Sequence, residues 1–181
     1  LGRDHRFKEL QNFFADHDVN LANLEVVLHH FDVYPAPVSG GSWACARPDV
    51  LEDLKDLGIN LLGCANNHSI DWNIGGVLST LKSVGDYGFP HAGLGKNLAE
   101  ASMPAYLNTP HGRVALISVT STCPVWGMAG EQRPDVMGRP GANVLRYDVI
   151  HRVLPEQMES LKKAADVTEV NDDRMLNEKE G

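Results

Sequence analysis

Two short apolar runs, with one helical segment between them, constrain the fold of this chain more than any other feature. The runs cover residues 19–24 and 59–65, and each has the length and composition of a buried strand. The segment between them starts after Pro48, carries leucines at helical spacing and reaches a natural stop at Gly58. Because a strand, a helix and a second strand in this order favour a crossover connection, the sequence predicts an α/β fold with parallel strands covered on both faces.

The rest of the chain alternates between helical spacing and β-rich runs. A long irregular loop is expected between Gly127 and Gly141, where glycine and proline are frequent. With 181 residues, the chain is expected to form one domain over 1–165, followed by an acidic mobile tail or insertion over 166–181. The other predicted elements are a helix over 7–14, a helix over 77–84, a short strand or turn over 89–95, an antiparallel hairpin over 105–120 and a helix over 155–165.

Charge and cysteine content argue against several classes of protein. The chain has 24 acidic and 16 basic side chains, and its net charge of −8 opposes the neutralisation of phosphates that nucleic-acid binding needs. Its three cysteines form no C-x-x-C pair, so we expect small buried thiols in place of a zinc knuckle or a disulfide framework. No Gly-x-Ser-x-Gly motif supports a serine hydrolase.

The tripeptide Asn66-Asn67-His68 directly follows the second buried strand. An Asn carbonyl is a neutral oxygen ligand, and a neighbouring His can bind a metal or give a proton to a leaving oxygen. Two amides and an imidazole at a sheet edge are costly to bury without partners. The alternative interpretation is a polar turn whose amides cap the next helix.

A second polar group, Asn23-Leu24-Glu25, ends the first strand. Alternation along a strand puts Asn23 and Glu25 on one face. The carboxyl ends of neighbouring parallel strands lie at one edge of a sheet, so we expect Glu25 to lie near Asn67 and His68, where its carboxylate would suit a hard divalent cation. The alternative is an exposed carboxylate at the end of a strand.

Asp71 and the Trp-Asn-Ile-Gly-Gly segment after it allow more than one role. The adjacent glycines Gly75 and Gly76 fit no phosphate-loop spacing. Helix capping is the first expectation for Asp71, and a hydrogen bond that orients His68 is the second. The other histidines show no metal-ligand spacing and are expected on the surface or in loops: His5, His17, His29, His30, His91, His111 and His151.

Several segments together resemble the CapA family of capsule-biosynthesis proteins, which is associated with poly-γ-glutamate and lies within the calcineurin-like metallophosphoesterase superfamily. They extend over about residues 1–165, and the Asn-Asn-His-x-x-Asp and Gly-Arg-Pro-Gly patterns are the more specific ones. The segments are Asn23-Leu24-Glu25, Ala65-Asn66-Asn67-His68 with Asp71 and Gly75-Gly76, Ala92-Gly93-Leu94-Gly95, and Gly138-Arg139-Pro140-Gly141-Ala142-Asn143 with Leu145-Arg146.

The resemblance implies a four-layer αββα metallophosphoesterase-like sandwich with mixed sheets, incomplete in this chain, and two divalent metal ions at the strand ends. The implied metal ligands are Glu25 and Asn67, and the implied catalytic residue is His68, which stabilises or protonates the reacting phosphate. The ions would be manganese, iron, zinc or magnesium, and would activate a bridging water that attacks the ester in line. The residues implied to support them are Asn23, Asn66, Asp71 and Arg3.

Departures from the family pattern fall at both ends of the chain and at one internal position. The family's first metal-ligating Asp precedes a Leu-Gly-Arg, and the chain begins at Leu1-Gly2-Arg3, so this ligand is expected before residue 1. A later His-x-His of the family is expected after Gly181. Asn73 stands where the family tends to have Gly, a mild change because Asn tolerates left-handed backbone angles.

Two functions of different classes follow from the resemblance. The first is a metal-dependent phosphoesterase-like hydrolase that acts on a phosphate ester or a polyglutamate-related substrate in capsule biosynthesis. The alternative is a non-catalytic component of a cell-envelope assembly for polymer synthesis or export, with an incomplete metal site. The resemblance also implies a location in the cell envelope and, for the full-length protein, a membrane-associated capsule synthesis complex.

Overall fold

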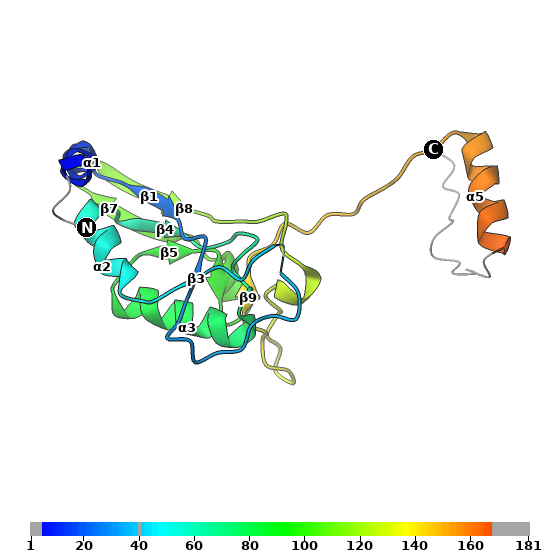
Figure 1. Cartoon of the computed structure of the whole chain (residues 1–181), viewed down its shortest axis with the longest axis horizontal. Coiled ribbons are helices and arrows are strands. Elements are labelled where there is room, and N and C mark those ends of the chain that lie inside the picture. The colour runs from blue at the N-terminus through cyan, green and yellow to red at the C-terminus, as the bar shows by residue number, and fades with distance from the viewer. Residues whose placement is uncertain (1–4, 40, 168–181) are drawn as a thin grey trace. The chain divides into compact units, whose positions relative to one another are not determined.

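The computed structural model describes residues 5–39 and 41–167. The chain forms two compact units, which cover residues 1–146 and 147–181. The first unit contains all the strands of the described chain and is a mixed α/β structure (Figure 1). The α/β class predicted from the sequence is therefore confirmed.

The second unit contains one helix, α5 (Pro155–Val167). This helix confirms the one predicted over 155–165. The predicted division into a domain over 1–165 and a tail over 166–181 stays a prediction, and residues 168–181 of that tail lie outside the described residues.

The first unit is built from short elements. Its helices are α1 (His5–Ala15), α2 (Val50–Leu57), α3 (Asn73–Asp86) and α4 (Leu98–Ser102), with a 3-10 turn η1 (Val125–Gly127). Its strands are β1 (Leu21–Asn23), β2 (Val27–Leu28), β3 (Cys45–Ala46), β4 (Leu61–Gly63), β5 (His91–Ala92), β6 (Leu94–Gly95), β7 (Ala105–Thr109), β8 (Gly112–Leu116) and β9 (Gly141–Ala142).

A parallel sheet with the order β1-β4-β5 forms the centre of the unit. In its register, Leu21 pairs with Leu61 and Asn23 pairs with Gly63. The crossover between β1 and β4 includes α2, which ends as predicted at Gly58, where φ is 100° and only glycine is unstrained. The predicted parallel pairing is therefore confirmed, although both strands are shorter than the apolar runs that contain them.

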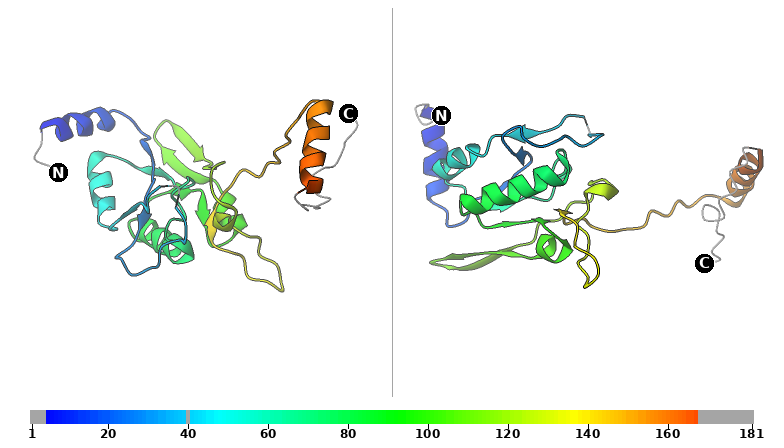
Figure 2. Two further views of the ribbon diagram at one scale, coloured as in Figure 1. Left: turned by 45° about the vertical axis from the view of Figure 1, so that its right-hand side comes forward. Right: turned by 90° about the horizontal axis from the view of Figure 1, so that it is seen from below.

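The sheet is covered on both faces, as expected for parallel strands. Neighbouring residues of β4 point to opposite faces, so Leu62 joins the core beneath α2 and α3, and Leu61 joins a smaller cluster with Ala105 of the hairpin. Figure 2 (right) shows these two helices on one side of the sheet and the hairpin β7–β8 on the other. The hairpin is antiparallel, as predicted.

Two segments that carry the family resemblance pair with each other in space. β6 and β9 are antiparallel, with Leu94 opposite Ala142 and Gly95 opposite Gly141. Each strand also lies against a further segment: a Cβ atom at Gly95 would overlap the backbone of Ala101 in α4, and one at Gly141 would lie 2.5 Å from the carbonyl oxygen of Gly127 in η1. Glycine is required at both positions because no other residue leaves room for the neighbouring backbone.

Some elements were not predicted. The parallel pair β2–β3 and the short helix α4 lie in stretches whose apolar residues have no clear period. The expected thiols are free, with Cys64 and Cys123 buried and Cys45 partly buried. Burial raises the pKa of Cys64 to about 12. Over residues 5–39 and 41–167, no helix has both the length and the apolar character needed to cross a membrane.

Candidate functional site at the carboxyl edge of the parallel sheet

The two polar segments predicted to converge meet at one edge of the sheet. β1 and β4 run in the same direction, and the backbone N–H of Leu24 still donates to Gly63 at 2.8 Å just beyond β1. The side chain of Asn66 then reaches across and donates to Asn23 Oδ1 at 3.1 Å. The chain continuing from each strand therefore brings its polar side chains to the same place, although the residues are more than forty positions apart in sequence.

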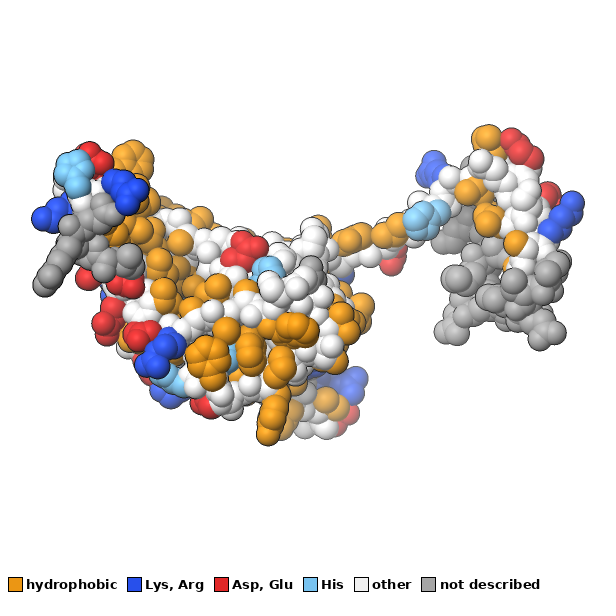
Figure 3. Space-filling view, viewed as in Figure 1, with side chains coloured by type: hydrophobic (Ala, Val, Ile, Leu, Met, Phe, Trp, Pro, Cys, Tyr) orange, Lys and Arg blue, Asp and Glu red, His pale blue; other side chains and the backbone are white. Residues whose placement is uncertain are grey.

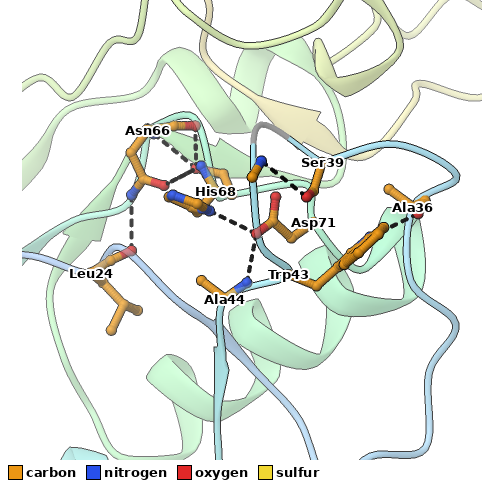
Figure 4. Close-up of polar contacts among 10 residues, drawn as sticks. Leu24, Ala36, Ser39, Trp43, Ala44, Asn66, His68 and Asp71 are labelled. Carbon is orange, nitrogen blue, oxygen red and sulfur yellow. Dashed lines mark hydrogen bonds and ion pairs between the residues drawn. The ribbon is translucent and has the colours of Figure 1, made fainter.

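Asn66 is the buried centre of this edge. Its Nδ2 group donates to Asn23 Oδ1 and also to the carbonyl oxygen of Leu24, at 2.9 Å. Its Oδ1 atom accepts from the backbone N–H of His68 at 3.0 Å and from the hydroxyl of Ser69 at 3.1 Å. Figure 4 shows the amide between the end of the first strand and the turn that carries the imidazole. Because all its polar atoms are used internally, Asn66 supports the site and is not free to bind a ligand.

Glu25 lies at the same edge and is exposed. Its Oε2 atom accepts a hydrogen bond from Asn23 Nδ2 at 3.0 Å, so the carboxylate is joined through Asn23 to the buried amide of Asn66. This single hydrogen bond leaves the other lone pairs of the carboxylate to a ligand from solvent.

His68 is held in one orientation by Asp71. The imidazole is partly buried, with 20% of its side chain exposed, whereas the Asp71 side chain is 4% exposed. His68 Nδ1 lies 2.7 Å from Asp71 Oδ2, and the backbone N–H of Ala44 donates to the same oxygen at 2.7 Å. Because an ionised carboxylate only accepts, Nδ1 carries the proton and Nε2 is the atom that can bind a metal or exchange a proton.

Asn67 is exposed, and its side chain makes no hydrogen bond with any residue in the described part of the chain. Its amide oxygen is therefore available to a ligand, in contrast to that of Asn66. Within the described ranges, no three His, Cys, Asp or Glu side chains are grouped closely enough to hold a metal ion. The donors gathered here are mixed: the carboxylate of Glu25, the amide of Asn67 and the imidazole of His68. Arg3 lies outside the described residues.

Asp71 does not cap the following helix, which was the first expectation for it. The helix α3 has Trp72 at its N-cap position, without a side-chain hydrogen bond, and the Asp71 carboxylate turns instead to His68 and Ala44. The second expectation, a hydrogen bond to His68, matches the geometry. Asn73 has a φ of 54°, the left-handed conformation that its side chain tolerates.

Gly75 and Gly76 belong to the first turn of α3 and allow close packing. A Cβ atom at Gly76 would lie 2.6 Å from Trp72 Cβ and 2.7 Å from Val27 Cγ1. One at Gly75 would lie 3.1 Å from Val33 Cγ1. These glycines therefore let β2 and the loop after it lie against the helix that starts at the site.

His29 was expected on the surface or in a loop, and it lies in the loop after β2 but is not exposed. It lies buried next to the site, with its ring centroid 4.2 Å from that of Trp72. Its Nδ1 atom accepts from the backbone N–H of Phe31 at 2.9 Å. Burial lowers the pKa of His29, while the nearby Asp32 raises it and His30 lowers it further. The sequence gives no sign of this burial because His29 and His30 are adjacent and lie outside any long periodic segment.

Comparison with known proteins identifies the family. A family model described as "Bacterial capsule synthesis protein PGA_cap" matches residues 2–172. The chain belongs to this family. The resemblance derived from the sequence is therefore confirmed, and the site lies within the PGA_cap region.

Curated relatives of this PGA_cap chain are considerably longer. It is 34% identical over 163 residues to "Uncharacterized protein y4sH" and "Uncharacterized protein y4uA" of Sinorhizobium fredii, in matches that cover 88% of the chain and 35% of each relative. It is 23% identical over 172 residues to "Capsule biosynthesis protein CapA" of Bacillus anthracis, covering 94% of the chain and 40% of that protein. The PGA_cap chain therefore spans well under half the length of these relatives.

Proposed function

We propose that the full-length protein is a metal-dependent phosphoesterase-like hydrolase of the CapA type that serves capsule or poly-γ-glutamate biosynthesis. Its substrate would be a phosphate ester or a polyglutamate-related compound. The observation that carries the proposal is the hydrogen-bonded series from Glu25 through Asn23 to Asn66, beside the His68–Asp71 pair, at one edge of a parallel sheet. Membership of a capsule synthesis family supports the biological setting.

The donors at this edge fit part of a centre for two divalent ions in a four-layer metallophosphoesterase-like fold. Glu25 offers an exposed carboxylate and Asn67 an amide that is not used by the described residues, and histidines elsewhere in the full-length protein would supply nitrogen donors. Mixed oxygen and nitrogen donors suit manganese, iron, zinc or magnesium. When bound, such ions would activate a water molecule for attack on a phosphate ester.

The residues of the chain then have distinct roles in the proposed reaction. His68 would stabilise or protonate the leaving oxygen as an imidazolium, in which Nδ1–H donates to Asp71 and Nε2–H supplies the proton. Asp71 is a positioning residue, since it touches His68 and Ala44 but is buried away from solvent. Asn66 holds the turn, through its bonds to both sides of the edge.

The alternative is a non-catalytic component of a membrane-associated assembly in the cell envelope that makes or exports a polymer. The observation that favours it is that the described residues supply one exposed carboxylate and one imidazole at this edge, and no group of three His, Cys, Asp or Glu side chains that could hold a metal ion. In that case Glu25, Asn67 and His68 would serve recognition and not chemistry.

The test uses the full-length protein, because the relatives are longer than this chain. Bound metal is measured by elemental analysis, and hydrolysis of a generic phosphodiester is measured before and after removal of metal with a chelator. Asn67→Ala, His68→Ala and Glu25→Gln are compared with His30→Ala, which changes an exposed histidine away from the hydrogen bonds of the site.

Hydrolysis that needs metal and falls about a hundredfold or more in His68→Ala, but is kept in His30→Ala, would support the hydrolase, since general acid catalysis typically contributes 10²–10⁴-fold. Equal rates in all the variants would remove the catalytic assignment. Absence of both metal and hydrolysis in the full-length protein would leave the non-catalytic component.

A further inference from the structure

The loop between β2 and β3 exposes several large apolar side chains close together. Phe31 is 66% exposed, Tyr34 86%, Val38 62% and Trp43 44%. Hydrophobic side chains gather over this loop on the face shown in Figure 3. Single exposed apolar residues are ordinary, but a group of them within one loop marks a surface that contacts a ligand or a partner.

Hydrogen bonds hold this loop in place without burying those side chains. The backbone N–H of Ala36 donates to the carbonyl oxygen of Asp71 at 2.7 Å, and Trp43 Nε1 donates to the carbonyl oxygen of Ala36 at 2.8 Å. Asn73 Nδ2 donates to the carbonyl oxygen of Pro35 at 2.7 Å. The loop backbone and the Trp43 indole are therefore held in a fixed arrangement, which lowers the cost of ordering them on binding.

The same loop is joined to the candidate site. Trp43 is followed by Ala44, whose N–H donates to the Asp71 oxygen that also contacts His68. Figure 4 shows Trp43 and Ala36 on one side of Asp71 and His68 on the other. A molecule that binds with its reacting group at His68 and extends beyond it can reach this loop.

The charge of the loop limits what it can bind. Asp32 is the one acidic residue among residues 31–44, and the segment has no Lys, Arg or His. A polyanion finds nothing to pair with here, whereas aromatic rings pack well against an uncharged apolar or ring-shaped group.

We propose that this loop is the specificity surface of the site, and that it binds an uncharged apolar or ring-bearing portion of the phosphate ester whose reacting group lies at His68. The proposal rests on the proposed function, which places the phosphate of the ester at His68. It adds that the substrate carries such a group next to its phosphate.

Binding of two phosphonates to the full-length protein tests this proposal. Phenylphosphonate and methylphosphonate have P–C bonds, so their affinities are measured by calorimetry independently of hydrolysis. Phenylphosphonate is expected to bind about fivefold more tightly, as one aromatic contact allows. Tyr34→Ala and Trp43→Ala should each reduce this preference toward equal binding, and the matched control Tyr106→Ala, an exposed tyrosine on β7, should keep it.

Equal affinities for the two phosphonates in the unaltered protein, or a preference that survives both loop variants, would overturn the proposal. Because Trp43 also donates to Ala36, the Tyr34→Ala variant decides the case if Trp43→Ala unfolds. A preference for phenylphosphonate without any hydrolysis would overturn the proposed function and keep the specificity surface. Binding of neither phosphonate would overturn both.

Discussion

His68 Nδ1 lies 2.7 Å from Asp71 Oδ2, and the backbone N–H of Ala44 donates to that same oxygen at 2.7 Å. One buried carboxylate therefore orients the imidazole and at the same time fixes the chain that leads into β3. An amide at this position would have a donor as well as an acceptor, and so would hold either tautomer of the imidazole.

The first prediction concerns Asp71→Asn. We expect hydrolysis by the full-length protein to fall about 10- to 100-fold, as for other residues that orient a metal-binding or catalytic His. Nitrogen NMR of the His68 ring should show the proton shared between Nδ1 and Nε2, and no longer mainly on Nδ1. The control is Asp86→Asn, which removes an exposed partner of Lys82. An unchanged His68 tautomer in Asp71→Asn would contradict the orienting role.

The second prediction concerns Asn66→Ala. The variant removes the partner of the His68 backbone N–H and of Asn23 Oδ1, so the free energy of unfolding should fall by about 1–3 kcal/mol. Urea unfolding measures the change, and Asn12→Ala on the exposed surface of α1 should be neutral within about 0.5 kcal/mol. Equal stability of the two variants would show that the link between the strand ends contributes nothing.

The third prediction concerns Gly76→Ala in α3. The added Cβ atom would lie 2.6 Å from Trp72 Cβ and 2.7 Å from Val27 Cγ1, so the helix and β2 must separate. We expect a loss of about 1–3 kcal/mol in the free energy of unfolding. Gly85→Ala lies in the same helix with nothing within 4 Å of its added Cβ, and should gain about 0.5–1 kcal/mol from helix propensity. A thermal melt compares the two, and a shift of both variants in the same direction would rule out the packing explanation.

The fourth prediction concerns pH. Burial lowers the pKa of His29 in the folded chain below its ordinary value of 6.5, so between these values the unfolded chain binds a proton that the folded chain does not. The contribution of neutral His29 to stability is fully present above 6.5 and is lost as the pH falls through the lowered pKa. His29→Gln should therefore lose less stability than the unaltered protein between about pH 7.5 and about pH 5.5.

Urea unfolding at both pH values checks this prediction. His151→Gln is the control, because His151 is exposed and is not among the groups that shift the pKa of His29, and this variant should keep the pH dependence of the unaltered protein. If His29→Gln also keeps the pH dependence of the unaltered protein, the prediction is wrong and other groups cause the loss of stability at low pH.

The sequence predicted those parts of the fold that depend on local patterns. Apolar runs and the Gly58 stop identified β1, α2 and β4, and the order of these elements led to the parallel pair that brings Asn23 near Asn66. The left-handed angle at Asn73 also follows from the residue itself. Each of these features is set either by residues close together in the chain or by the direction of two neighbouring strands.

The rest depends on contacts without a sequence period. The bond between Ala44 and Asp71 joins residues 27 positions apart and uses a backbone N–H, which every residue but proline has. His29 is buried against Trp72, which is far from it in sequence. The position of Trp43 beside the site also depends on contacts between distant residues, so the sequence does not predict it.

The packing around β6 and β9 limits which segments can be exchanged between PGA_cap proteins. Residues 92–95 and 138–143 lie far apart in the gene but share one narrow interface, in which Gly95 and Gly141 leave room for the backbones of other segments. A chimera that replaces residues 92–95 should also take residues 100–101, and one that replaces residues 138–143 should also take residues 127–129, because a side chain in place of either glycine would overlap the backbone of those segments.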